Sequence, residues 1–239
     1  MIRIERTSCP DCLKDVASDG NAYTRGEVAE ALWKMQHGKC CYSEVQIPKK
    51  GHGKHIEHWK PQSAFSWLRN EWTNLLLACP QCNGSKSDQY PIVLTEKNDD
   101  GQILYLNHRS GGTAIIIDPS APGLNPEREL TYVLDDRDPL YGQVTAREGS
   151  VLGRATIEIT GIADSHFLRL RKDRLLTVLD ATYRNILLAA NNSNEDACDA
   201  ALETFRGYLS PKSVFAGLAR EFAREKKLDV HFNLQIPDA

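Results

Sequence analysis

The fold is decided by the stretch from Gly38 to Tyr90, which reads GKCCYSEVQIPKKGHGKHIEHWKPQSAFSWLRNEWTNLLLACPQCNGSKSDQY. Gly51 and Gly53 lie between two segments that contain β-formers, so the stretch predicts a short hairpin. Further along, Pro80 suits the first position of a helix. The predicted order is therefore a β-hairpin, a loop and a helix. The hairpin strands would be Cys41–Ile47 and Lys54–Trp59, and the helix would carry Cys82, Asn83 and Lys86.

Polar residues follow one another in a specific order within this stretch. The acid–His pair Glu57-His58 precedes a central Asn74, an apolar run, and Asn83 three residues before Lys86. This order resembles the HNH, or ββα-metal, endonucleases. The resemblance implies an α+β fold, with a ββα-metal nuclease core, an N-terminal extension and a mainly α-helical C-terminal half. It also implies a metal-dependent enzyme that hydrolyses phosphodiester bonds of nucleic acid.

The resemblance assigns a role to each of these residues. His58 would be the general base, because an imidazole with a pKa of about 6.5 accepts a proton at neutral pH, and Asn74 would hold it in position. Glu57 and Asn83 offer oxygen ligands that suit Mg²⁺ or Mn²⁺. Lys86 lies one helical turn from Asn83, so its cation would hold a phosphate. Adjacent residues on a strand point to opposite faces, which would separate Glu57 from His58. In the family the acid–His pair lies at a strand end, where the backbone turns, so that the base and the acid reach one site from two sides.

The cysteines indicate a second metal site. Cys79 and Cys82 have zinc-ligand spacing, and a tetrahedral site needs two more ligands. Zinc-containing relatives carry a second such pair before the strand, whereas here Cys40 is followed three residues later by Ser43. The three cysteines would bind a structural Zn²⁺ or, without metal, act as small buried hydrophobes. The fourth ligand stays open among Cys41, a nearby His, Cys9 and Cys12.

The composition is that of a globular chain. The 239 residues (26.8 kDa) are 41% hydrophobic and 26% charged, which excludes wholesale disorder. The sequence has no stretch typical of a signal peptide and no apolar run long enough to span a bilayer, so we expect a cytoplasmic protein, without a membrane partner, whose seven cysteines are reduced. The net charge of −3 divides into +4 for residues 34–88 and −7 elsewhere. Few basic side chains are thus available to bind the phosphates of a long duplex, and a partner would supply part of the affinity for nucleic acid.

The chain divides into four predicted regions. Residues 1–36 form an N-terminal extension and residues 37–92 form the nuclease core. Residues 93–148 are an irregular connection with short strands, because this region is rich in Asp, Gly, Pro and Asn. Residues 149–239 form a helical region, since apolar residues recur there at helical spacing. We expect this helical region to dock a partner.

Several elements are expected within these regions. A helix capped by Thr24 would end near Gln36, a second would cover Glu195–Leu209, and a third would start at Ser210-Pro211 and end at Lys227. Ser193 or Asn194 would cap the second helix. Short strands are expected at Ile103–Leu106, Ala114–Ile117 and Leu130–Leu134.

Other polar and aromatic residues are given structural roles. His52 and His55 lie in a Gly- and Lys-rich turn and are typical of solvated residues, so they stay outside the predicted site. Three tryptophans are expected in the core rather than stacked on bases, namely Trp59, Trp67 and Trp72. A basic run is expected to form a solvated helix face or a partner contact, namely Arg169, Arg171, Lys172 and Arg174.

Short later segments extend the resemblance to the HNH subunit of retron and Septu anti-phage systems, a PtuB-like family. In that family the nuclease acts with an ABC-type ATPase (PtuA-like), in some systems with a retron reverse transcriptase bound to multicopy single-stranded DNA. The resemblance implies an anti-phage effector with DNA as the favoured substrate. Three alternatives stay open: the same site cutting structured RNA such as tRNA, a non-catalytic zinc-supported nucleic-acid-binding module, and an interaction protein. The segments are Tyr90-Pro91, Ile117-Asp118-Pro119, Ala155-Thr156-Ile157 and Leu170-Arg171-Lys172.

Overall fold

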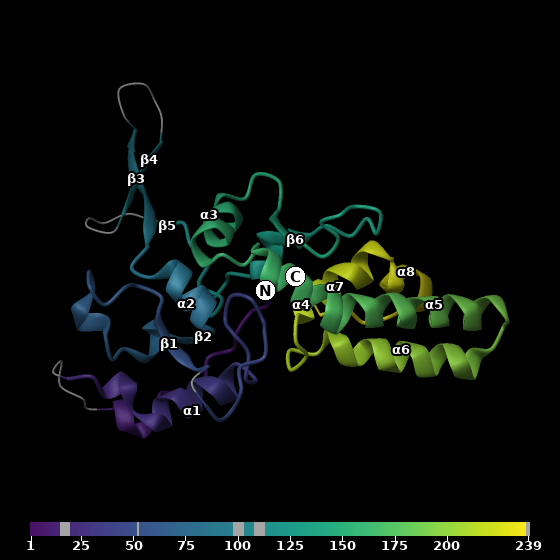
Figure 1. The fold of residues 1–239 in the computed structure, drawn as a ribbon, viewed down its shortest axis with the longest axis horizontal. Coiled ribbons are helices and arrows are strands. Elements are labelled where there is room, and N and C mark those ends of the chain that lie inside the picture. Colours follow the sequence, from purple (N-terminus) through teal and green to yellow (C-terminus); the bar gives the residue numbers. More distant parts are fainter. Residues whose placement is uncertain (15–19, 52, 98–102, 108–112, 238–239) are drawn as a thin grey trace.

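The computed structural model describes residues 1–14, 20–51, 53–97, 103–107 and 113–237. A small two-stranded sheet and one helix form the centre of residues 37–92, the predicted nuclease core. Strand β1 (His55–His58) pairs antiparallel with β2 (Leu75–Ala78), with His58 opposite Leu75. Helix α2 (Pro80–Lys86) follows directly, with proline at its start as expected. Figure 1 shows these three elements next to one another.

The predicted pairing of the hairpin is wrong. Lys54–Trp59 does contain a strand, but its partner is the apolar run Leu75–Ala78. Residues 41–47 instead form a tight loop in which Glu44 has a positive φ of 60°, and the loop is closed by an isolated bridge between Lys39 and Gln46. All four residues of β2 are buried, so this strand lies in the middle of the core. It makes with β1 the backbone pairing that was predicted for residues 41–47.

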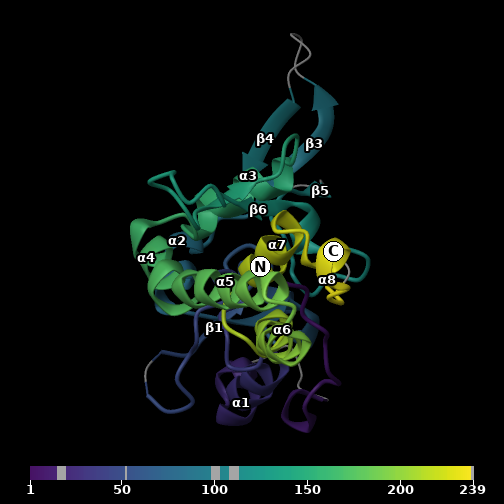
Figure 2. The same ribbon diagram turned by 90° about the vertical axis from the view of Figure 1, so that its right-hand side faces the viewer.

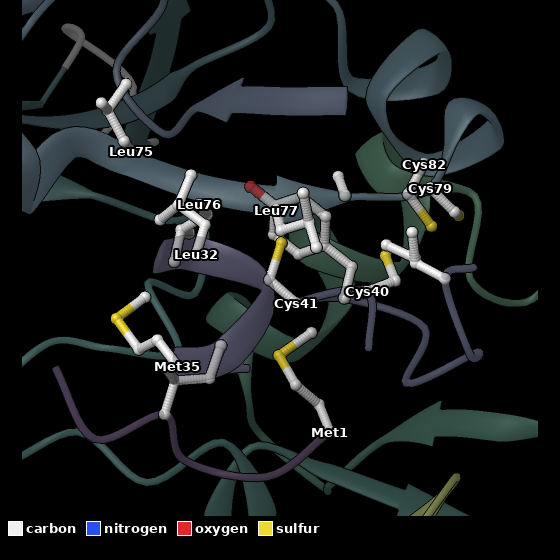
Figure 3. Packing of buried hydrophobic residues seen from close by; sticks show 14 of the residues in the cluster. Met1, Leu32, Met35, Cys40, Cys41, Leu75, Leu76, Leu77, Cys79 and Cys82 are labelled. Carbon is white, nitrogen blue, oxygen red and sulfur yellow. The ribbon is translucent and has the colours of Figure 1, made fainter. Parts of the chain in front are cut away.

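Helix α1 (Gly26–Met35) covers β2 from the other side. It buries an apolar stripe that includes Leu32 and Met35, and Figure 3 shows Leu32 beside Leu76. The helix starts two residues after the expected cap, because the Thr24 hydroxyl donates to the Asn21 carbonyl instead of capping. Just beyond the helix, the Gln36 amide donates to and accepts from the backbone of Leu77 at 2.8 and 2.7 Å, which fixes the helix to the strand.

The connecting region contains short strands, as expected. β3 (Pro91–Lys97) lies between β4 (Ile103–Asn107) and β5 (Thr113–Ala114), and β6 (Leu130–Tyr132) pairs with β7 (Val144–Ala146). The expected strand at Ala114–Ile117 is shorter than predicted. Its apolar residues Ile116 and Ile117 leave the sheet and are buried in the core. Short 3₁₀ turns complete the irregular parts of the described chain, at Asp11–Leu13, Ala22–Thr24, Ser66–Leu68, Trp72–Asn74 and Pro126–Arg128.

The C-terminal half is helical, which confirms the α+β class with a helical second half. Asn194 caps α6 as predicted, accepting from the Ala197 amide. The last long helix begins at Ala216 and not at Pro211, since residues 210–215 turn and Phe215 has a φ of 53°. The helices are α3 (Val151–Thr160), α4 (Ser165–Arg171), a π-helical turn (Lys172–Leu176), α5 (Thr177–Asn191), α6 (Glu195–Leu209), α7 (Ala216–Glu225) and α8 (Leu228–Phe232).

The helical half has its own apolar core and is also joined to the nuclease core. Val45, Tyr132 and Leu170 pack against both apolar cores, and the Lys39 ammonium donates to the Ser213 carbonyl at 2.7 Å. Figure 1 shows the α5–α6 hairpin extending away from β1, β2 and α2, and in Figure 2 the hairpin lies in front of β1. In the described parts of the chain, no helix has the length and apolar character needed to span a membrane.

Candidate active site

Glu57 and His58 are the last two residues of β1, so the acid–His pair lies at a strand end as expected. The two side chains are buried and belong to opposite faces of the strand. One face carries His55 and Glu57 and is covered by α2. The other face carries His58 and is covered by the loop that joins β1 to β2.

His58 is held by a backbone carbonyl. Its Nε2 lies 2.9 Å from the Arg69 carbonyl oxygen, and the Tyr23 ring contacts its ring edge-on at 4.6 Å. A carbonyl only accepts hydrogen bonds, so Nε2 carries the hydrogen and Nδ1 of the neutral ring is left as the acceptor. Burial lowers the pKa of His58 from its ordinary value, outweighing the bond to Arg69. The ring is therefore neutral at pH 7 and able to take a proton.

Asn74 fixes the loop that supplies this carbonyl. Its Oδ1 accepts from the Lys60 amide at 2.8 Å, and its Nδ2 donates to the carbonyls of Lys60 and Leu68 at 3.0 and 3.3 Å. Its own carbonyl accepts from the Trp59 amide at 3.0 Å. These bonds connect the residues after β1 to the residues before Arg69. Asn74 therefore controls where the His58 ring is held.

Glu57 lies beside a buried lysine. The Lys86 ammonium is 2.5 Å from Glu57 Oε1, and the Tyr42 hydroxyl donates to the same oxygen at 3.3 Å. Burial raises the pKa of Glu57 to about 7, although Lys86 and Tyr42 both oppose this. Lys86 also donates to the His58 carbonyl at 3.0 Å and has no exposed surface. This position differs from the expected phosphate contact, since the ammonium is enclosed and already paired.

The prediction that His55 is a solvated residue of a turn is wrong, because His55 is the half-buried first residue of β1. Asn83, half-buried on α2, has its Nδ2 3.4 Å from His55 Nδ1. His55 is two residues before Glu57 and so shares its strand face. The sequence signal for including His55 in the site was its position two residues before Glu57 on the same short strand. His52, its neighbour in the turn, lies outside the described residues.

The donors on this face fit a hard divalent cation. The Glu57 carboxylate and the Asn83 amide oxygen are ligand types that Mg²⁺ and Mn²⁺ prefer, and His55 adds an imidazole that suits Mn²⁺ better than Mg²⁺. Two or three protein ligands leave positions free for water and phosphate oxygens. The structure thus brings Glu57, Asn83 and Lys86 to one face of β1, and His58 with Asn74 to the other.

The cysteines form a separate cluster at the start of α2. The sulfur atoms of Cys40, Cys79 and Cys82 all lie within 4.8 Å of one another, and all three residues are buried. The Ser43 hydroxyl is 3.7 Å from the Cys79 sulfur. Figure 3 shows Cys41 among Leu77 and Met1, on the far side of Cys40 from the other two cysteines. Three soft donors at this separation fit a tetrahedral Zn²⁺ that lacks one ligand.

The expectation that all three tryptophans are in the core is wrong for Trp67. Trp72 is buried and Trp59 is half-buried, but Trp67 is 68% exposed. It lies on the loop that holds His58, with its ring 5.6 Å from the Phe65 ring. This aromatic surface is therefore open to solvent near the acid–His pair.

The predicted solvated basic face is wrong for Arg171. Arg169 and Arg174 are exposed, but Arg171 is 2% exposed, with its guanidinium over the rings of Tyr132 and Phe215. Helix α4 directs the Arg171 side chain into the junction between the two apolar cores. The basic run is thus divided between the surface and the interior.

Comparisons with known proteins agree with this geometry. The family model for HNH endonuclease matches residues 40–89. Septu protein PtuB of Bacillus mycoides (strain KBAB4) is 26% identical over 187 residues, which cover 72% of this chain and 58% of that protein. Septu protein PtuB of Bacillus thuringiensis is 28% identical over 106 residues, or 39% of this chain and 41% of that protein. No solved structure matches the chain significantly.

The chain spans less than two thirds of the length of these curated relatives. The HNH match covers β1, β2, α2 and the three clustered cysteines, which are the parts described above. Residues 40–89 therefore match the HNH endonuclease family, and the chain as a whole is similar to the Septu PtuB proteins.

Proposed function

We propose that the chain is a metal-dependent endonuclease that hydrolyses phosphodiester bonds, preferably of DNA, as the effector of an anti-phage defence system. The observation that carries the proposal is the neutral, carbonyl-held His58 at the end of a strand whose other face presents Glu57 and Asn83. Phosphodiester hydrolysis by an HNH site needs a base and a cation at one phosphate. Glu57 and His58 end β1, and the turn of the backbone there would let both groups reach that phosphate. The similarity to Septu PtuB proteins supports the defence role.

His58 would take a proton from the attacking water at Nδ1. The Arg69 carbonyl keeps the other ring nitrogen protonated, and Asn74 keeps that carbonyl in place. Glu57, Asn83 and His55 would hold the catalytic Mg²⁺ or Mn²⁺. When bound, the cation supplies a Lewis acid for the charge that develops on the phosphate and the departing oxygen. We assign Lys86 to positioning Glu57, because its ammonium is enclosed between Glu57 and the His58 carbonyl.

We further propose a structural Zn²⁺ at Cys40, Cys79 and Cys82. Two of these residues flank the first turn of α2, and the third lies in the loop beside β2. Such an ion would fix the loop to the helix that carries Asn83 and Lys86. Thiolates suit Zn²⁺, whereas the oxygen-rich face of β1 suits the catalytic cation, so the two sites would take different metals.

The proposed protein partner is an ABC-type ATPase of the PtuA-like kind, as the Septu similarity suggests. The helical region 149–239 is the proposed docking region. Its support is the exposed apolar side chains of α5, which include Val178, Leu187 and Leu188. The retron reverse transcriptase and its single-stranded DNA stay a prediction.

The test is a cleavage assay with the purified protein, alone and with its genomic-neighbour ATPase. Plasmid DNA and total tRNA are incubated with Mg²⁺, Mn²⁺ or EDTA, and wild type is compared with His58→Ala and with the distant control His231→Ala. Cleavage that needs metal and His58, and that survives His231→Ala, is the expected result, and the molecule that is cut identifies the substrate. Cleavage by a folded His58→Ala variant at the wild-type rate would refute the proposal.

A further inference from the structure

The proposed zinc centre lacks one ligand within its cysteine cluster. Structural Zn²⁺ sites are almost always four-coordinate, and Cys₃His is one of their common ligand sets. Among the described residues, the group within mutual ligand distance contains Cys40, Cys79 and Cys82 alone. Cys41 is separated from Cys79 and Cys82 (Figure 3). The missing ligand must therefore come from another element or from solvent.

A cavity of about 300 Å³ beside the cluster shows which element is available. Cys79 and Gln81 line it from the start of α2, and His166 and Phe167 line it from α4 of the helical half. Of the described side chains around this cavity, His166 is the one besides Cys79 that commonly binds zinc. Its ring packs against the Phe167 ring at 5.4 Å and makes no hydrogen bond among the described residues, so it is free to turn.

Arg171, on the same helix, provides a second and independent observation. Its Nη2 donates to the Ile162 carbonyl at 2.9 Å, but its buried Nε and Nη1 have no hydrogen-bond partner in the described structure. Burial lowers the pKa of Arg171, and the Glu44 carboxylate opposes that effect. A buried cation is costly without a compensating anion. Three thiolates and one Zn²⁺ would leave a net charge of −1 next to it.

We propose that His166 is the fourth ligand of a zinc ion at Cys40, Cys79 and Cys82, so that the metal joins the nuclease core to α4 of the helical half. This inference rests on the proposed zinc centre and goes beyond it, since it assigns a ligand outside the HNH domain. The ring of His166 would turn into the cavity that it shares with Cys79. Arg171 then offsets the negative charge of the centre from the same helix.

The test measures zinc affinity rather than cleavage. Zinc content per chain and affinity in competition with a chromophoric chelator are determined for the full chain and for His166→Ala, with His231→Ala as a matched control on the exposed surface of α8. Loss of a ligand should lower affinity at least as much as the roughly 10- to 100-fold typical of losing an outer-shell partner. Wild type and His231→Ala should bind one zinc with equal affinity.

A rescue variant separates loss of a ligand from loss of fold. Ser43 lies 3.7 Å from the Cys79 sulfur, so Ser43→Cys should supply a fourth thiolate without His166. The double variant with His166→Ala should regain wild-type affinity. After substitution with Co²⁺, its sulfur-to-cobalt charge-transfer absorption should exceed that of wild type, which would have one thiolate fewer. The His166→Ala protein should show altered ligand-field bands.

Two results would overturn the inference, and they are distinguishable. If His166→Ala binds zinc with wild-type affinity and an unchanged Co²⁺ spectrum, Ser43 or water completes the site and His166 does not. If the folded wild-type protein binds no zinc and Cys79→Ser changes nothing, the zinc centre itself is refuted along with its fourth ligand. Neither result bears on metal-dependent cleavage by His58, which is measured separately.

Discussion

Replacing Asn74 with alanine tests whether this residue acts by holding the loop around His58. The substitution removes three side-chain hydrogen bonds to backbone groups of Lys60 and Leu68. At about 1 kcal/mol net for each bond, the free energy of unfolding should fall by about 3 kcal/mol. The loop would then release the Arg69 carbonyl, and a displacement of about 1 Å at the base costs on the order of 100-fold in rate.

The assay combines urea unfolding with single-turnover cleavage at saturating metal. Asn74 touches no proposed metal ligand, so the concentration of Mn²⁺ that gives half-maximal cleavage should stay unchanged while the rate falls. Thr73→Ala is the matched control, because its exposed side chain contacts only Glu71 among the described residues. An Asn74→Ala protein with wild-type stability and wild-type cleavage would refute the positioning role, and a changed metal requirement would indicate a ligand role instead.

Three further predictions follow from the geometry of the site. Burial lowers the pKa of His58, so the acid limb of the pH profile of the cleavage rate should lie below pH 6.5, and an acid limb above pH 7 would contradict this. The free energy of unfolding should also fall as the pH drops below 6.5, because the unfolded chain binds the proton more readily than the folded protein. Lys86→Met should lower the free energy of unfolding at pH 8 by up to about 3–5 kcal/mol, because the buried Glu57 carboxylate loses its cation and must stay buried with the Tyr42 hydroxyl alone or take up a proton. Adding Glu57→Gln should recover part of the loss, and equal stability of the single and double variants in urea would refute the pair. Trp67→Ala should weaken nucleic-acid binding by about 1–3 kcal/mol in a titration if the exposed ring stacks on a base, while stability stays unchanged, and Trp67→Phe should retain most of the affinity.

Local signals in the sequence predicted the elements that depend on neighbouring residues. Pro80 begins α2 and Asn194 caps α6, because proline at the first turn and an asparagine side chain at the cap act within a few residues. The pairing of β1 was predicted wrongly, because antiparallel partners are chosen by burial across the whole core. The apolar run Leu75–Ala78 is more distant in sequence than residues 41–47 and still forms the strand.

The candidate site likewise combines features that the sequence predicted with features that depend on tertiary packing. The order of Glu57, His58, Asn74 and Asn83 identified an HNH domain, since the chemistry of the family requires these residue types in that order. The enclosed position of Lys86 and the contact of His55 with Asn83 could not be predicted, because both depend on how α2 packs against β1. Neither feature has a signature in the spacing of residues along the chain.

The sequence by itself determined the α+β class, the HNH domain and the three cysteines that come together, because turn residues, helix caps and the order of polar residues act along the chain. The tertiary structure alone decided which groups surround each of them. It buried Arg171 and placed His166 beside the cysteine cluster by packing α4 of the helical half against the nuclease core. Contacts between residues that are more than eighty positions apart follow from the packing of whole elements, and no local pattern records them.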